Sequence, residues 1–492
     1  MLDAQGPNCR PTDGPTHWPT QGPTHRSAHR PTHLHAPQGW VAGRWQPNVL
    51  LGIGADGCWS EVSTGVAAVP DHCLQLHAPV LPGLVNAHSH AFQRAFAGLA
   101  ERRESQADDF WSWRDRMYGV AQRVSPAGLR ALATQLYVEL LRGGYTQVCE
   151  FHYLHHQPDG RPYDEPATLM AVLTDAADDA GLGATLMPVL YERAGFAEAT
   201  LRTDQRRFAS TPALVEALCR TVQAWARAGR RHINAGIAIH SLRAASPSAI
   251  ATLLERFSAD DVPIHVHVAE QEREVQDCLA ATGLRPIEWL CHHAQIDARW
   301  QLVHATHATP QEIDAVAARG AGIVICPSTE GNLGDGFADL PAWLRANVPM
   351  AIGSDSHVTR CWAEELRWLE YGQRLRLRQR NVAAAPQAGE PSTAARLFNA
   401  ALAGGGRAAG QPRWGLEVGA RADALVLDVR APGLLGVPSA QQLDALVFAT
   451  DAPAIDTVYV AGQRVISGGR HGDEDAIAAR FAATMDALWQ GA

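Results

Sequence analysis

Short apolar segments alternate with longer segments of helical pattern through the middle of the chain. Eight apolar segments have the length of buried strands, and each is followed by a stretch with helical periodicity. These predicted strands span residues 85–90, 147–153, 185–191, 235–241, 264–269, 301–305, 323–326 and 350–353. Eight strand–helix repeats predict a (β/α)8 barrel of the TIM type over residues 82–404, in which chemistry takes place at the carboxyl ends of the strands.

The two ends of the chain have a different pattern. Residues 39–81 and 405–470 contain short apolar runs punctuated by glycine, which is typical of small antiparallel strands. We expect these two segments to pair into one small β-sandwich domain, followed by a C-terminal helix over 471–492. Residues 1–38 repeat a Pro-Thr-His theme with almost no aliphatic side chains, which predicts a disordered extension.

Composition agrees with a soluble enzyme that has a small-molecule substrate. Hydrophobic residues make up 46% and charged residues 19% of the 492 positions, close to globular averages. The formal net charge is −9, and no arginine-rich run interleaves with aromatic residues, which argues against nucleic-acid binding.

Cysteine spacing and hydropathy bear on the cellular compartment of the protein. The nine cysteines are scattered, odd in number and without C-x-x-C spacing, so we expect free thiols in a cytoplasmic setting. We find neither a run of about 20 apolar residues, as a membrane span requires, nor a secretory pattern at the N-terminus. We therefore expect no membrane partner.

Potential metal ligands fall at the ends of the predicted strands. The first strand ends in His88-Ser89-His90, and the two-residue period of a strand places both imidazoles on one face. Such a pair alone is a weak signal, because surface and core histidines produce it too. The fifth strand adds His267 and the eighth leads to Asp355. Three imidazoles and a carboxylate predict one divalent metal ion, zinc first, with iron or manganese as alternatives.

Other polar residues share these strand ends. Glu270 follows His267 and supplies an acid/base group, and His304 lies on the sixth strand. His265 shares a face with His267, and we interpret it as a hydrogen-bonded histidine of a deeper barrel layer. For His307 and His357, spacing does not distinguish a group that orients a neighbour from an ordinary loop residue.

This set of residues resembles the pattern of the amidohydrolase superfamily, over essentially the whole chain from residue 40 onward. The matching positions are His88, His90, His267, Glu270, His304 and Asp355. The resemblance implies a metal-dependent hydrolase. Some members of that superfamily bridge two metals with a carboxylated lysine, whereas this sequence contains no lysine and all 42 basic residues are arginine. We therefore expect a single metal.

The loops after the strands resemble those of one family within this superfamily. Segments 91–96, 111–114, 150–156, 240–243, 326–336 and 362–372 look like those of the formimidoylglutamate deiminases, with Ser328 and Gly331 as conservative departures. This resemblance implies hydrolysis of the linear amidine C–N bond of N-formimidoyl-L-glutamate, giving N-formyl-L-glutamate and ammonia in histidine degradation. It also implies a homodimer.

A glutamate derivative carries two carboxylates, which guanidinium groups bind through paired hydrogen bonds. We expect Arg114 and Arg243 to fill this role, although a solvated surface position is the more common fate of an arginine. The resemblance implies that Gln93, Tyr153 and His240 supply further hydrogen bonds to the substrate.

The expected reaction uses three of the strand-end residues. With a divalent metal to activate water, we expect Asp355 to accept the proton of that water and Glu270 to pass a proton to the departing nitrogen. His304 is expected to stabilise the attacking hydroxide or the tetrahedral intermediate by hydrogen bonding.

Two alternatives stay open. Another mononuclear deaminase of the superfamily, acting on a purine, pyrimidine or triazine, would share the metal motif but would recognise a flat ring by stacking and edge hydrogen bonds rather than with two arginines. A non-catalytic barrel scaffold is a more remote alternative, because folds are reused. The presence of all six superfamily residues argues against it.

Overall fold

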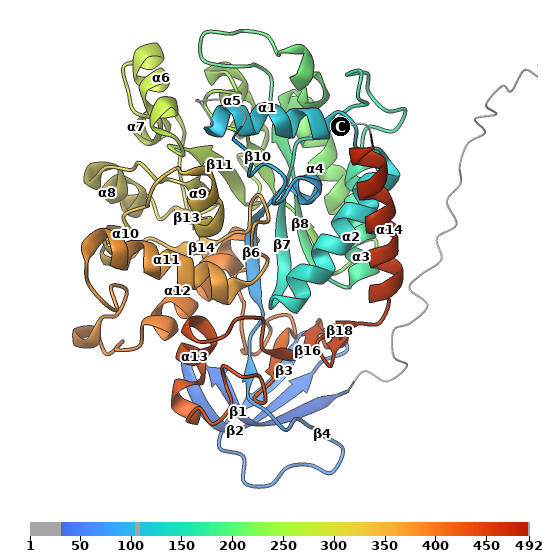
Figure 1. Cartoon of the computed structure of the whole chain (residues 1–492), viewed down its shortest axis with the longest axis vertical. Helices are drawn as coiled ribbons and strands as arrows, with labels where there is room; N and C mark the ends of the chain where they lie inside the picture. The colour runs from blue at the N-terminus through green and yellow to red at the C-terminus, as the bar shows by residue number, and fades with distance from the viewer. Residues whose placement is uncertain (1–30, 104–108, 491–492) are drawn as a thin grey trace, which may run out of the picture.

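The computed structural model describes residues 31–103 and 109–490, which form a barrel with a smaller sheet at one end (Figure 1). Strand β5 (Val80–Leu81) belongs to the smaller sheet and leads directly into the first barrel strand, β6 (Leu84–Ser89). The amino end of β6 therefore faces the smaller sheet. Its carboxyl end, next to His90, lies at the opposite end of the barrel.

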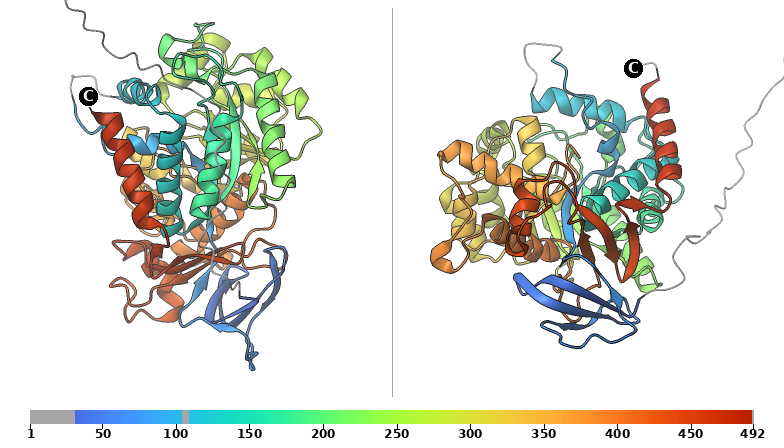
Figure 2. Two further views of the ribbon diagram at one scale, coloured as in Figure 1. Left: turned by 90° about the vertical axis from the view of Figure 1, so that its right-hand side faces the viewer. Right: turned by 60° about the horizontal axis from the view of Figure 1, so that its bottom comes forward.

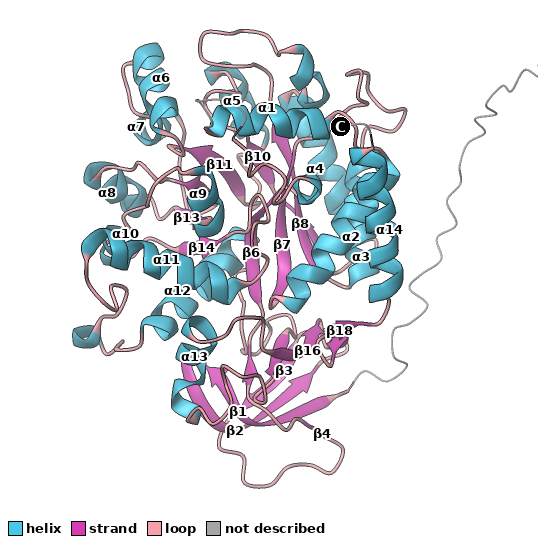
Figure 3. Ribbon diagram, in the orientation of Figure 1, coloured by secondary structure: helices cyan, strands magenta, loops and turns pink. Residues whose placement is uncertain are grey.

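Parallel strands form the barrel at the centre of the molecule (Figure 3). After β6 the order is β7 (Tyr145–His152), β8 (Gly183–Leu190), β10 (Ile237–Ile239), β11 (Ile264–Val268), β12 (Trp300–His304), β13 (Gly322–Ile325) and β14 (Met350–Ile352). A parallel bridge between Ser89 and Asp355 links the last strand to the first. The predicted eight-position barrel is confirmed.

The fourth barrel position differs from the single strand predicted over 235–241. There the structure has two short strands, β9 (Ile233–Ala235) and β10, separated by Gly236. Both pair with β8, and the N–H of Gly236 donates to the carbonyl of Leu186. The interruption at glycine shortens the strand without removing it from the barrel.

Helices surround the barrel and cover its strand ends: η1 (Ala91–Ala95), α1 (Phe110–Ala121), α2 (Pro126–Arg142), α3 (Thr168–Ala180), η2 (Thr203–Phe208), α4 (Pro212–Arg227), α5 (Pro247–Arg256), α6 (Glu272–Thr282), α7 (Pro286–His293), α8 (Pro310–Ala318), α9 (Pro327–Leu333), α10 (Leu340–Arg345), α11 (Trp362–Leu377) and α12 (Thr393–Ala408). Four of them, α2, α4, α5 and α8, begin with the same local signal. A Ser or Thr side chain accepts a backbone N–H of the first turn, and proline occupies the next position.

The smaller sheet joins both ends of the chain. It contains β1 (His33–Val41), β2 (Arg44–Ile53), β3 (Trp59–Ser63), β4 (Leu74–Gln75), β5, β15 (Ala424–Leu427), β16 (Ile455–Val460), β17 (Gln463–Ser467) and β18 (Arg470–His471). Antiparallel pairing of β5 with β15 connects the two halves into one continuously hydrogen-bonded sheet. Side chains of its own strands, Trp59 and Tyr459 among them, form an apolar core separate from that of the barrel.

The prediction of a disordered extension over residues 1–38 is wrong for its last residues. Residues 33–38 belong to β1, which pairs with β2 from His33 to Val41. Leu34 and Ala36 are fully buried in the core of the smaller sheet, so alternate apolar side chains stabilise a strand that the Pro-Thr-His composition concealed. Residues 1–30 of that expected extension lie outside the described residues.

The last helix, α14 (Glu474–Trp489), falls within the segment 471–492 for which a helix was expected, and it runs along the barrel beside α2 (Figure 2). The indole N–H of Trp489 donates to the carbonyl of Ala95 at 3.2 Å, which ties this helix to η1 after the first barrel strand. In the sequence, α13 (Gln442–Phe448) comes between β15 and β16, and it packs against α11 and α12. None of the helices within 31–103 and 109–490 has the length and apolar character of a membrane span.

Candidate metal centre and active site

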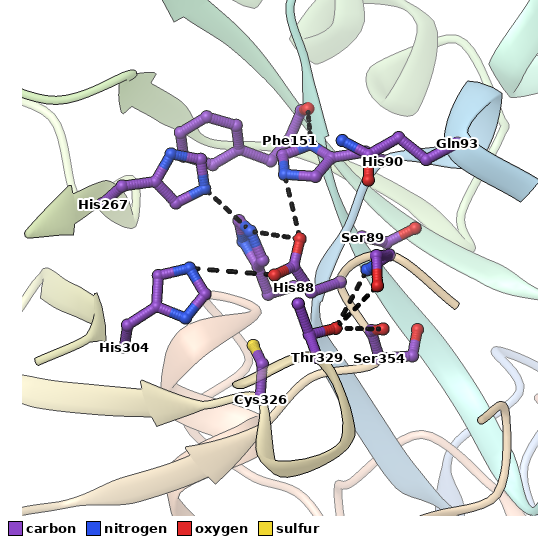
Figure 4. Close-up of polar contacts among 12 residues, drawn as sticks. His88, Ser89, His90, Gln93, Phe151, His267, His304, Cys326, Thr329 and Ser354 are labelled. Atoms are coloured by element: carbon purple, nitrogen blue, oxygen red, sulfur yellow. Dashed lines mark hydrogen bonds and ion pairs between the residues drawn. The ribbon is translucent and has the colours of Figure 1, made fainter. Parts of the chain in front are cut away.

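Three histidines and one aspartate converge at the carboxyl end of the barrel (Figure 4). Nε2 of His88 lies 2.9 Å from Nε2 of His267 and 3.5 Å from Oδ1 of Asp355. Nε2 of His90 lies 3.3 Å from the same Oδ1 atom. Four donors placed about 2.1 Å from a tetrahedral zinc ion are about 3.4 Å from one another. The separations between these side chains therefore fit a metal cage.

The charge states of these residues also fit a cation. Burial lowers the pKa of His88 to about 3, and burial together with the neighbouring His88 lowers the pKa of His267 well below its usual value. Burial alone would raise the pKa of Asp355, but hydrogen bonds and charge from His88 and His90 lower it well below its usual range. Neutral imidazoles beside an ionised carboxylate are the protonation states that bind a divalent metal.

Backbone geometry brings the donors together. Nδ1 of His90 donates to the carbonyl of Phe151 at 2.9 Å, which leaves the lone pair of Nε2 for a ligand. A Cβ at Gly353 would lie 2.6 Å from Cβ of His88, so glycine is required where β14 approaches β6. Asp355, two residues later, has a left-handed φ of 45°, and its N–H donates to the carbonyl of His88 at 3.0 Å.

The two further catalytic candidates flank this cluster. Nε2 of His304 lies 3.7 Å from Oε1 of Glu270 and 3.7 Å from Oδ2 of Asp355. Burial raises the pKa of Glu270 to about 7. Burial disfavours a charged His304, but Glu270, Glu330 and Asp355 outweigh it and raise its pKa to about 10. A carboxyl group that titrates near neutrality suits proton transfer.

Both arginine candidates line a cavity of about 690 Å³. The guanidinium carbons of Arg114 and Arg243 lie 4.6 and 5.2 Å from the ring of Trp111, so the tryptophan on α1 brings the two cations together. Nη1 of Arg243 and Nε of Arg114 are buried without a hydrogen-bond partner among residues 31–103 and 109–490. Such donors are available to an anionic ligand. A larger cavity, of about 1380 Å³, lies on the flank of the barrel among α2, α3, α4 and α14, away from these residues.

The remaining substrate-binding candidates lie next to the metal cluster. The ring of His240 is 5.0 Å from that of His267 and 5.5 Å from that of Tyr153. The Tyr153 hydroxyl accepts a hydrogen bond from the Gln93 side chain at 3.0 Å. Burial, followed by the charge of Arg243, lowers the pKa of His240 well below its usual value. Ring contacts thus place Tyr153 and His240 beside each other and His240 beside the metal cluster, and Gln93 contacts Tyr153.

Comparisons with known proteins agree with this arrangement. The model of the amidohydrolase family matches residues 80–465. The chain belongs to the amidohydrolase family. It is 45% identical over 453 residues to formimidoylglutamate deiminase from Pseudomonas aeruginosa, covering 92% of this chain and 97% of that protein. The crystal structure of an amidohydrolase from Brucella melitensis superposes with a TM-score of 0.87 at 41% identity, covering 93% of this chain and 99% of that one.

An adenosine deaminase from Xanthomonas campestris with bound zinc has the same fold. Its structure superposes with a TM-score of 0.77 at 23% identity, covering 93% of this amidohydrolase and 98% of that chain. At this identity the likeness concerns the fold alone.

Buried glutamates that the sequence analysis did not single out as site residues support the strand ends of this amidohydrolase. Glu274 accepts the backbone N–H of Glu270 at 3.0 Å, and Glu330 accepts that of Cys326 at 3.0 Å. Both lie in the first turn of a helix that follows a barrel strand. An acidic residue in that position is the only signal the sequence offers, and it is also typical of ordinary helix starts.

Glu150, within the segment expected to distinguish the substrate, faces away from the site. Its carboxylate accepts the Ser89 hydroxyl at 2.8 Å and the Ala91 N–H at 2.7 Å. It therefore holds the turn after β6, whereas its neighbour Phe151 faces the metal cluster with its ring 4.4 Å from that of His267.

The other barrel histidines have structural contacts. His265 donates to the carbonyl of Ala408 at 2.8 Å, which confirms the prediction of a hydrogen-bonded histidine in a deeper layer. His357 lies 2.9 Å from the Ser354 hydroxyl and 3.0 Å from the carbonyl of His90, so it links the loops that contain His90 and Asp355. Nε2 of His307 has no hydrogen-bond partner within the described ranges.

Proposed function

We propose that this amidohydrolase hydrolyses N-formimidoyl-L-glutamate to N-formyl-L-glutamate and ammonia, a step of histidine degradation. The observation on which this rests is a candidate metal cage together with two arginines, Arg114 and Arg243, that line one cavity and each keep a buried N–H donor without a partner among the described residues. A dicarboxylate substrate matches that pair, since guanidinium groups bind carboxylates in a fixed fork. The 45% identity to the formimidoylglutamate deiminase of Pseudomonas aeruginosa supports the same substrate.

We propose a single divalent metal, zinc first, held by His88, His90, His267 and Asp355. The donor set suits it, because the Nε2 atoms of two neutral imidazoles face each other at 2.9 Å beside an ionised carboxylate. A divalent metal in such a site supplies a Lewis acid that activates water near neutral pH. The absence of lysine from the sequence argues for one metal rather than two.

The side chains around the cage have the positions for proton transfer. Asp355 and Glu270 both lie 3.7 Å from Nε2 of His304, so the three groups surround one small volume. In the proposed reaction Asp355 accepts the proton of the attacking water, and Glu270 delivers a proton to the nitrogen that leaves as ammonia. His304 donates a hydrogen bond to the oxygen that adds to the formimidoyl carbon.

The five substrate-binding candidates have separate roles in this proposal. Arg114 and Arg243 bind the two carboxylates of the glutamate moiety. The Gln93 side chain donates to the Tyr153 hydroxyl, which orients this phenol beside His240. Tyr153 and His240 then contact the substrate between the carboxylates and the reacting carbon.

One experiment tests both metal and substrate. The purified protein is analysed for metal by mass spectrometry and assayed for ammonia release from N-formimidoyl-L-glutamate, guanine and cytosine. We expect one metal ion per chain and ammonia from formimidoylglutamate only. Ammonia from a ring substrate instead would identify a ring deaminase, and absence of both metal and turnover would identify a scaffold.

We further propose that the protein is a cytoplasmic homodimer. The eight cysteines within the described residues are all free thiols, which suits a reducing compartment. The dimer rests on the resemblance to the formimidoylglutamate deiminases. Light scattering coupled to size-exclusion chromatography measures the mass, and a value near 53 kDa, the mass of one chain, would contradict the dimer.

A further inference from the structure

Asp335 is a buried carboxylate next to the candidate active site. It lies in the turn after α9, between Gly334 and Gly336, whose left-handed φ angles are 72° and 122°. These glycines and Phe337 are exposed, whereas Asp335 is only 5% exposed. The turn therefore directs one acidic side chain inward while the backbone around it stays at the surface.

The two oxygens of this carboxylate have different surroundings. Oδ1 accepts a hydrogen bond from the side-chain amide of Gln271, the residue after Glu270. Oδ2 is buried and has no hydrogen-bond partner within residues 31–103 and 109–490. A buried carboxyl oxygen without a partner is costly, so its position indicates a ligand that donates hydrogen bonds.

The groups that act electrostatically on Asp335 include residues of the candidate site. Burial, followed by the charge of Glu270, raises the pKa of the Asp335 carboxyl well above its usual range, and a cation bound beside it would oppose this shift. Because Gln271, which donates to Asp335, directly follows Glu270, the two carboxyl groups lie in one region, whereas Arg114 and Arg243 line a separate cavity. A ligand that satisfies both regions has carboxylates at one end and a cation at the other.

We propose that Asp335 and Glu270 bind the amidinium group of the substrate, with Oδ2 of Asp335 accepting an N–H of the terminal nitrogen. This assignment rests on the proposed function, because a formimidoyl group is an amidine that is protonated at neutral pH. An amidinium, like a guanidinium, is planar and presents N–H donors in a fixed plane, which carboxylates accept with defined geometry.

The same contact explains which nitrogen leaves and why the product departs. Water adds its oxygen to the formimidoyl carbon, the C–N bond to the terminal nitrogen breaks, and this nitrogen leaves as ammonium, so charge and atoms balance. Asp335 holds the positive charge at the beginning and at the end. The formyl group left behind is neutral and has no proton for Oδ2, so Asp335 favours substrate over product.

Two ligands that differ in charge test this assignment. N-Carbamimidoyl-L-glutamate carries a guanidinium cation, and N-carbamoyl-L-glutamate is its neutral analogue with the same two carboxylates. Calorimetric titration of the zinc-loaded protein is expected to show at least about tenfold tighter binding of the cation. Asp335→Asn should abolish this preference, leave the Kd of the neutral ligand unchanged and retain the metal. Asp314→Asn, at an exposed position of α8, is the control for loss of one negative charge.

The outcomes separate this inference from the proposed function. An Asp335→Asn protein that keeps the wild-type ratio of the two Kd values overturns the role of Asp335, and so does a wild-type protein without preference. Asp335→Glu, which keeps the charge, should retain the preference if Asp335→Asn fails to fold. Lack of ammonia release from N-formimidoyl-L-glutamate would contradict the proposed function alone, because the ratio of Kd values is measured without turnover.

Discussion

Oε1 of Glu330 lies 3.4 Å from Nδ1 of His304, while the other ring nitrogen of this histidine points toward Glu270. The same glutamate oxygen accepts the backbone N–H of Cys326 at 3.0 Å. Because both contacts use one oxygen, Glu330 fixes the orientation of the His304 ring relative to the end of β13. The left-handed φ of 69° at His304 shows that its backbone is constrained as well.

We predict that Glu330→Gln lowers kcat by about 10- to 100-fold, which is the usual effect of removing a partner that orients a site residue. KM and metal content should stay near wild-type values, because Glu330 contacts His304 rather than a proposed metal ligand. Steady-state kinetics and metal analysis check both points. Glu255→Gln, at an exposed position of α5, serves as control. An unchanged kcat would show that the ring needs no such support.

Much of the candidate site could be predicted because strand periodicity is local. His88 and His90 share a face two residues apart, and His267 and Asp355 follow strand ends that the barrel brings together. Glu330 and Asp335 could not be predicted, because their roles depend on contacts across the barrel mouth. Glu330 reaches a residue 26 positions away, and Gln271 lies 64 positions from Asp335.

At the first strand, the sequence led to a wrong prediction of disorder. Residues 33–38 contain two histidines and a proline, like the preceding segment, yet they form a strand because β2 and the core of the smaller sheet cover Leu34 and Ala36. The composition of a segment indicates whether it is ordered in isolation. It does not reveal the hydrogen bonds and apolar contacts that a neighbouring strand provides.

Replacing Glu270, the proposed proton donor, should slow the reaction far more than it weakens substrate binding. We predict that Glu270→Gln reduces kcat by about 10² to 10⁴, the contribution usual for a general acid or base. Metal content should be unchanged, since the four proposed ligands remain. The comparison is with Glu272→Gln, which removes an exposed carboxylate two residues away. Full activity of the Glu270 variant would exclude Glu270 as the proton donor.

Glu365 predicts a pH dependence of stability. Burial raises its pKa to about 8 in the folded chain, against about 4.3 in an unfolded one. The folded state therefore holds a proton that the unfolded state releases. The stabilising contribution is complete below about pH 4.3 and is lost as pH rises toward 8.

Glu365→Gln isolates this contribution. Glutamine can still accept the Ser328 N–H, which now donates to Glu365 at 2.9 Å, but it does not ionise. Thermal unfolding from pH 5 to 8.5 should show a Tm that falls with pH more steeply in the wild type than in the variant. Over this pH range the free energy of unfolding of the wild type is expected to fall by several kcal/mol more than that of the variant, since one pKa unit corresponds to about 1.4 kcal/mol. Parallel curves for the two proteins would contradict a raised pKa at this position.

If Arg243 binds a substrate carboxylate as proposed, its removal should affect an anionic substrate more than a neutral one. Arg243 is 7% exposed, its guanidinium lies over the ring of Trp111, and its Nη1 is a buried donor without a partner among the described residues. A hydrogen bond to a charged group contributes about 1.5 to 3 kcal/mol, and 1.4 kcal/mol corresponds to a factor of ten. We predict that Arg243→Met lowers kcat/KM for N-formimidoyl-L-glutamate by at least about tenfold. The loss for N-butylformamidine, which has no carboxylates, should be much smaller, and Arg345→Met on α10 should affect neither. Equal losses on both substrates would mean that Arg243 supports the fold rather than binding a carboxylate.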